Sequence, residues 1–264
     1  MTQLRFLTLP VIASLALAGC STTSGGGTNG GGATPPPDPT TEKTFREQLA
    51  EGVNAETTRL SQGAVANGTA NITMAGSTTI GSVNAPKTLS VTLDGTTYDM
   101  TLFSLSTTKG TNYSTFKFHD SADNNQVGTL IVGDNVAVGD VNLDHNASIF
   151  GVRAGILTAA DAMPNQTASY AGKWHLGASS TGSLDATANF DSGTIAFDIQ
   201  DLAGAPTGAG IGSISGNSFA SSFDIYPSTN TVLGNFYGPD AAEMAGIITG
   251  DSAPDVGYLY GSKK

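Results

Sequence analysis

The chain is poor in the residues on which catalysis and covalent cross-linking usually depend. Its 264 residues include one cysteine, three histidines and one tryptophan, and only 12% of them are charged. A single cysteine cannot form a disulfide within the chain. The sequence also lacks the GxSxG and HExxH motifs and a glycine-rich phosphate-binding loop. We therefore expect a binding or structural protein, not an enzyme, whose fold is stabilised by packing.

Positive charge is also scarce, and this excludes one class of partner. Eleven basic residues stand against 22 acidic ones, which gives a net charge of −11, or −12 once Arg5 is removed with the leader described below. Nucleic-acid binding depends on Lys and Arg contacts to phosphate, so we expect no nucleic-acid partner. The 34 glycines, together with many threonines and serines, are typical of a turn-rich, mainly β protein.

Residues 1–20 have the pattern of a lipoprotein signal peptide. The apolar stretch from Phe6 to Ala18 is too short to span a membrane, and Leu17-Ala18-Gly19-Cys20 matches the bacterial lipobox. We expect Cys20 to be lipidated and to anchor the protein stably through several acyl chains. Ser21 after the cysteine favours sorting to the outer membrane. The alternative is an ordinary cleaved signal peptide.

A tether and a first domain follow the leader. Residues 21–41 carry two glycine triplets and one proline triplet, which predicts a disordered tether. Residues 42–146 are expected to form a small β-rich domain with one helix over Glu42–Leu60. Thr44 and Glu47 have the spacing of a capping box at the start of this helix.

Period-two alternation from Gly68 onwards predicts antiparallel strands. Asp94-Gly95 is typical of a type I′ hairpin turn, and Gly133-Asp134-Asn135 forms the tip of another hairpin. Residues 147–165 read as a connector with a helical turn near its end. Residues 147–264 contain eight candidate strands with a turn every eight to twelve residues, which predicts a soluble eight-stranded antiparallel β-barrel.

Two stretches of this C-terminal part resemble a known family. The run GNFYGPDAAEMAGIITGD, which starts at Gly234, and the run from Met163-Pro164 to Trp174 are similar to the C-terminal barrel of transferrin-binding-protein-like bacterial surface lipoproteins, which include haem-capturing and factor-H-binding relatives. The resemblance implies that residues 42–146 correspond to the family's N-terminal handle domain. We interpret the shared residues as a folding motif: Tyr170, Gly172, Trp174, Phe236, Tyr237, Gly238, Pro239, Glu243 and Gly246. Within it we expect a tight corner at Tyr237-Gly238-Pro239 with Glu243 hydrogen-bonded to backbone, and a ligand contact is the alternative for these four residues.

Candidate ligand-binding residues are few. His119 ends a strand rich in aromatic residues, which suits an axial haem ligand, and Tyr113 and His145 are the other candidates. For each histidine the competing interpretation is a solvated loop residue, and His175 reads as a plain surface histidine. The acidic residues around Asp120 and Asp140 are expected to be solvated turns, with a bound cation as the alternative. No metal site is predicted.

We therefore expect a lipid-anchored outer-membrane protein displayed on the cell surface. The resemblance implies capture of haem or an iron-carrying host protein for delivery to an outer-membrane transporter, and recognition by a surface-export machinery. One alternative is an adhesin or immune-evasion protein that binds a host protein. The other is a structural lipoprotein that faces the periplasm.

Overall fold

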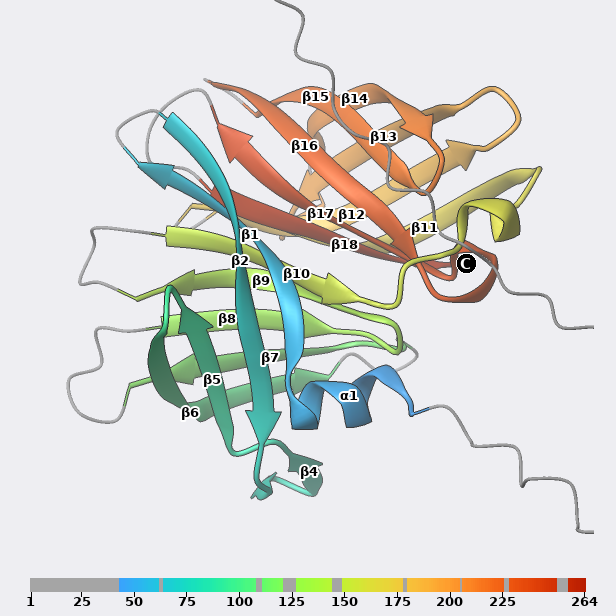
Figure 1. Cartoon of the computed structure of the whole chain (residues 1–264). Helices are drawn as coiled ribbons and strands as arrows, with labels where there is room; N and C mark the ends of the chain where they lie inside the picture. Colours follow the sequence, from blue (N-terminus) through green and yellow to red (C-terminus); the bar gives the residue numbers. More distant parts are fainter. Residues whose placement is uncertain are drawn as a thin grey trace, which may run out of the picture. The chain divides into compact units, whose positions relative to one another are not determined.

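The structure is a computed structural model that describes residues 43–61, 64–107, 111–120, 127–143, 149–177, 180–204, 206–225, 228–250 and 256–264 (Figure 1). The predicted leader, the lipidation site Cys20 and the tether lie outside the described residues and stay predictions. His145 also lies outside them. Residues 42–264 form one compact unit.

The helix starts where the sequence predicts and ends earlier. α1 spans Phe45–Glu51, and Thr44 and Glu47 form the expected capping box. The predicted extension to Leu60 is wrong, because Gly52 takes a φ of 107° that ends the helix, and strand β1 (Val53–Ser61) begins at the next residue. In the part of the chain that the structure describes, no helix is long and apolar enough to cross a membrane.

The handle-like domain is itself a closed antiparallel barrel of eight strands, in the order β1-β10-β9-β8-β7-β6-β5-β2. A short hairpin, β3–β4, lies outside this barrel. The remaining bounds are β2 Ala64–Ala75, β3 Thr78–Ile80, β4 Val83–Ala85, β5 Thr88–Leu93, β6 Thr96–Thr107, β7 Ser114–His119, β8 Val127–Val132, β9 Val136–Asn142 and β10 Ile149–Gly155.

The predicted domain boundary after residue 146 needs a correction. Residues 147–165 read as a connector because of their glycines, yet β10 occupies Ile149–Gly155 and pairs with both β1 and β9. It supplies the strand that closes the first barrel. The predicted turn at Asp94-Gly95 is present, since both residues have positive φ, as a type I′ turn requires.

The second barrel has the eight predicted strands in sequence order, β11 to β18, each antiparallel to its neighbours, with β18 closing onto β11. The predicted fold class is therefore confirmed. The glycine-rich stretch after Leu202 is mostly strand, because β14 already starts at Pro206. The bounds are η1 Ala160–Ala162, β11 Thr167–Leu176, β12 Ser180–Asn189, β13 Thr194–Asp201, β14 Pro206–Ser215, β15 Ser218–Ile225, β16 Ser228–Tyr237, η2 Pro239–Ala241, β17 Glu243–Gly250 and β18 Val256–Lys263.

Each barrel is filled by its inward-facing side chains, and a third apolar cluster joins the two barrels. The first core includes Ile72, Leu89 and Phe118, and the second includes Trp174, Leu184 and Phe236. Most of the joining cluster lies on the outward faces of β8 and β9 in the first barrel and of β17 and β18 in the second, with Tyr113 just before β7 and Tyr237 at the end of β16. Its residues are Tyr113, Ile131, Val136, Val138, Tyr237, Ala245, Ile247, Val256, Tyr258 and Tyr260. The described strands therefore form one packed body.

Candidate functional site: the junction of the two barrels

Glu243 bridges the barrels at one end of this junction. Its carboxylate accepts hydrogen bonds from the backbone N–H of Asp134 at 2.9 Å and of Asn135 at 2.8 Å, both at the tip of the β8–β9 hairpin. The Tyr260 hydroxyl donates a third bond at 2.9 Å. Burial raises the pKa of Glu243, and the three hydrogen bonds oppose that shift. The expected bonds from Glu243 to backbone are present, and they cross between domains.

The corner that precedes Glu243 is held by the chain between the barrels. The Gly238 N–H donates to the Ile156 carbonyl at 2.8 Å, and the Thr158 hydroxyl donates to the Gly238 carbonyl at 2.7 Å. Pro239 then opens η2, and Tyr237, at the end of β16, is buried in the joining cluster. The corner therefore ties the inter-barrel segment to the second barrel.

The other residues of the predicted motif lie inside or along the wall of the second barrel. The Tyr170 hydroxyl donates to the Ala241 carbonyl at 2.8 Å, and Trp174 Nε1 donates to the Gln200 carbonyl at 2.9 Å. Phe236 is fully buried beside the Tyr170 ring. Gly172 and Gly246 sit at close approaches between neighbouring strands, where a Cβ would overlap adjacent atoms. All these contacts join residues of the second barrel to one another.

The predicted haem residues are not brought together. Tyr113 directly precedes β7 and His119 ends it, which places them roughly 20 Å apart along the chain. Tyr113 is buried in the joining cluster, with its ring 4.8 Å from that of Tyr260. His119 lines a separate pocket of about 450 Å³, where its ring lies edge-on to Phe103 at 5.2 Å. The described residues therefore place His119 at a pocket without Tyr113.

A polar cluster at one margin of the junction corrects two predictions. Asp140 was expected in a solvated turn, but it lies in β9, and burial raises its pKa to about 7. His175 was expected at a plain surface, but its ring lies 5.3 Å from that of Tyr258. Burial and the nearby Lys117 charge lower the pKa of His175. Both side chains face the opposite barrel, which is why the pattern of one strand could not place them.

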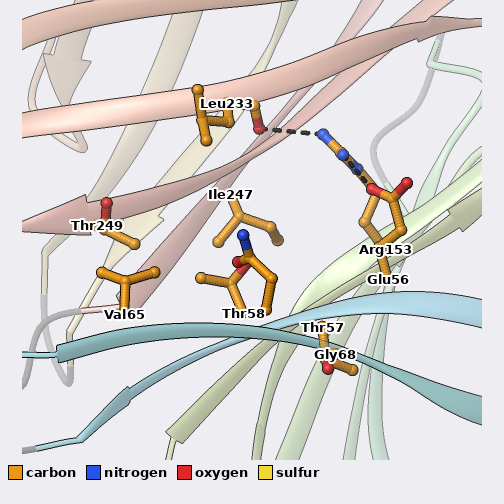
Figure 2. A pocket seen from close by; sticks show the side chains of 10 residues that line it. Glu56, Thr57, Thr58, Val65, Gly68, Arg153, Leu233, Ile247 and Thr249 are labelled. Carbon is orange, nitrogen blue, oxygen red and sulfur yellow. Dashed lines mark hydrogen bonds and ion pairs between the residues drawn. The ribbon is translucent and has the colours of Figure 1, made fainter. Parts of the chain in front are cut away.

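Arg153 crosses the junction at its other margin (Figure 2). This residue of β10 donates through Nη1 to the Leu233 carbonyl at 3.0 Å and pairs through Nη2 with Glu56 of β1. It lies at one side of a groove of about 340 Å³ that we call the Arg153 groove. The groove is lined by Glu56, Thr57, Thr58, Val65, Asn67, Gly68, Arg153, Leu233, Ile247 and Thr249.

The Arg153 groove combines an ion pair with apolar side chains from both barrels. Val65 of β2 and Leu233 of β16 leave 53% and 54% of their surface exposed. Figure 2 shows them on opposite sides of the groove, above and below Ile247. Exposed apolar side chains gathered beside a concave surface are a common mark of a contact site for another molecule.

Comparison with known proteins identifies the second barrel. Residues 163–264 match the sequence model of a family described as the C-lobe and N-lobe beta barrels of Tf-binding protein B. This barrel belongs to the transferrin-binding-protein-like family. A comparison with curated protein sequences gives no match. The match begins at Met163, just before β11, and therefore covers the whole second barrel.

Crystal structures of transferrin binding protein B share the fold of both barrels. The isotype 1 protein from serogroup B Neisseria meningitidis aligns with a TM-score of 0.53 and 16% identity, over 79% of this chain and 43% of that one. A double mutant of the protein from Haemophilus parasuis Hp5 aligns with a TM-score of 0.51 and 17% identity, over 79% and 44%. The chain thus spans less than half the length of these transferrin-binding proteins.

The sequence analysis did not predict the Arg153 groove or the ion pair between Arg153 and Glu56. Arg153 lies in the segment that the sequence predicts to be a connector, whereas the structure places it in β10. Glu56 lies in the segment that the sequence predicts to be helical, whereas the structure pairs it with Arg153 of β10. In the part of the chain that the structure describes, no three His, Cys, Asp or Glu side chains are grouped so that they could hold a metal ion.

Proposed function

We propose that the protein is a lipid-anchored lipoprotein of the outer-membrane surface that captures an iron-carrying host protein and passes it to an outer-membrane receptor. The observation that carries this proposal is the second barrel, whose sequence matches the barrels of Tf-binding protein B over its full length. The two-barrel fold shared with transferrin binding protein B supports it. Lipidation of Cys20 and surface display belong to the same proposal, and protease treatment of intact cells tests the display.

The Arg153 groove is the surface that suits capture of a protein best. Its volume of about 340 Å³ is at the low end for small-molecule sites, while it fits one or two side chains of a partner. Apolar anchors surrounded by polar groups are typical of the centre of protein interfaces. Val65 and Leu233 supply the apolar part, and Glu56 supplies negative charge with 67% of its side chain exposed.

Binding to immobilised protein tests this proposal directly. We expect iron-loaded transferrin, lactoferrin or haemoglobin to bind the wild-type protein, and Leu233→Glu to weaken that binding at least about tenfold. Ile211→Glu is the matched control, because Ile211 is an exposed apolar residue on β14, outside the groove. If none of these carriers binds, the proposal is refuted. If both variants weaken binding equally, the Arg153 groove is not the binding site.

A second candidate ligand is haem itself, held in the pocket at His119. This pocket of about 450 Å³ is largely apolar, with Phe103 and Val127 both exposed beside the imidazole. His119 Nδ1 lies 3.1 Å from the Asp120 carbonyl oxygen. A haem titration followed by absorbance should give a shifted Soret band that His119→Ala removes and His175→Ala retains. An unchanged band with wild-type protein rules this ligand out.

A further inference from the structure

The first barrel leaves one long strand edge without a partner. β2 pairs with β1 along residues 64–72, but its pairing with β5 covers only Asn71–Ala75. Residues 64–70 therefore extend beyond β5, and no other strand among the described residues pairs with their second edge. Residues 65–69 are all exposed. An unpaired edge presents a row of backbone N–H and C=O groups that can accept another strand.

This edge lacks the usual features that prevent pairing with another chain. Residues 64–70 read Ala-Val-Ala-Asn-Gly-Thr-Ala, with no charge and no proline. Exposed edge strands in natural proteins are commonly protected by lysine, proline, a bulge or a covering segment. The register of β2 against β1 is continuous, with no bulge. Nothing in the described structure of this edge therefore opposes the addition of a strand.

We propose that two copies of the protein pair through this edge, antiparallel and about a two-fold axis at Asn67. The segment is self-complementary about that residue. Across the axis, Ala66 of one copy then lies opposite Gly68 of the other, Val65 opposite Thr69, and Ala64 opposite Ala70. A two-fold contact requires such a match of one surface with itself. Small side chains also allow the two edges to approach closely. Pairing would join the two barrels that contain β2 into one continuous sheet.

The pairing is expected to be weak and sensitive to salt. Seven residues per copy bury much less than the roughly 1,200 Å² of stable complexes, so association should need micromolar concentrations or more. The net charge of −11 repels the second copy, whereas the edge itself carries no charge. Added salt screens that repulsion and should strengthen the dimer. If attraction between opposite charges held the dimer together, added salt would weaken it instead.

Sedimentation velocity on the protein without residues 1–20, which keeps every described residue, tests the dimer. Wild type should shift from monomer to dimer as concentration rises to a few hundred micromolar. In Asn67→Asp the Thr58 hydroxyl keeps its acceptor, which lies 3.1 Å away, while two carboxylates come to face each other across the axis. We expect the association constant to fall about fivefold at low salt. A wild-type protein that stays monomeric throughout overturns the proposal.

Two further proteins separate edge pairing from damage to the fold. Asn84→Asp is the matched control, because Asn84 also accepts a bond from a cross-strand threonine, Thr79, at 3.3 Å, but on the β3–β4 hairpin. It should dimerise as wild type does. Asn67→Lys alone should be weakened like Asn67→Asp, whereas an equimolar mixture of the two should form heterodimers. Pairing at this edge is contradicted if the mixture associates no more strongly than either variant alone, or if Asn67→Asp associates as strongly as wild type.

Discussion

Replacing Asp140 by asparagine is expected to stabilise the protein, and to do so more strongly at pH 8 than at pH 5. Asp140 lies in β9 opposite Thr129, at the margin of the junction between the barrels. Its Oδ1 atom is buried and has no hydrogen-bond partner within the described structure. Burial raises its pKa to about 7, against opposing contributions from its own backbone N–H and from the Lys117 charge. Asparagine keeps the shape and cannot ionise.

The size and sign of the effect follow from this pKa. A carboxyl whose folded-state pKa is raised binds its proton more tightly in the folded protein, so its stabilising contribution is complete below the unfolded value and is lost as pH rises through the folded value. For Asp140 this stabilising contribution is lost over the pH range between the ordinary pKa of 3.8 and the folded-state pKa of about 7. At about 1.4 kcal/mol for each pH unit, ionisation costs on the order of 4 kcal/mol at pH 8 and between 1 and 2 kcal/mol at pH 5.

Urea unfolding followed by tryptophan fluorescence measures the difference. Trp174 is the single tryptophan and is buried in the second barrel. The free energy of unfolding of Asp140→Asn minus that of wild type should grow by roughly 2 to 3 kcal/mol between pH 5 and pH 8. Asp198→Asn, on an exposed position of β13, is the control and should show no such growth. A difference that stays constant with pH would refute the buried, ionising carboxyl.

Three further predictions concern stability and can be checked by the same unfolding assay. Glu243→Ala leaves two hairpin-tip N–H groups and the Tyr260 hydroxyl without their acceptor, and should cost about 2 to 4 kcal/mol. Gly172→Ala places a Cβ against the Tyr260 carbonyl oxygen and should cost at least about 2 kcal/mol. Thr44→Ala removes the capping box shared with Glu47 and should cost about 1 kcal/mol. An effect within error of zero contradicts the corresponding contact.

The local features of the fold were predictable because they depend on neighbouring residues. The capping box at Thr44 and the type I′ turn at Asp94-Gly95 are both present. The eight strands of the second barrel were predictable from period-two alternation together with a turn every eight to twelve residues. The local pattern did not predict where the helix ends. The apolar residues of β1 also fit one face of a helix, and only the positive φ at Gly52 separates the helix from the strand interpretation.

The candidate site was less predictable, because its residues come from strands far apart in the sequence. Arg153 reaches a carbonyl 80 residues away, and Glu243 reaches N–H groups more than 100 residues away. Such contacts depend on how two closed barrels pack, which no short-range pattern encodes. His119 shows the same limit. Tyr113 is close to His119 in the sequence, yet it does not line the pocket at His119.

One signal of the junction was nevertheless present in the sequence. A strand in the wall of a small barrel normally alternates between buried and exposed residues, as β13 does. β9, β17 and β18 are instead buried on both faces over most of their length. Strands with apolar residues on both faces need a second cover, as in sheets packed on two sides. The outer cover here is the other barrel, so the run Val136-Ala137-Val138 and the run Ile247-Ile248 already marked where the domains meet.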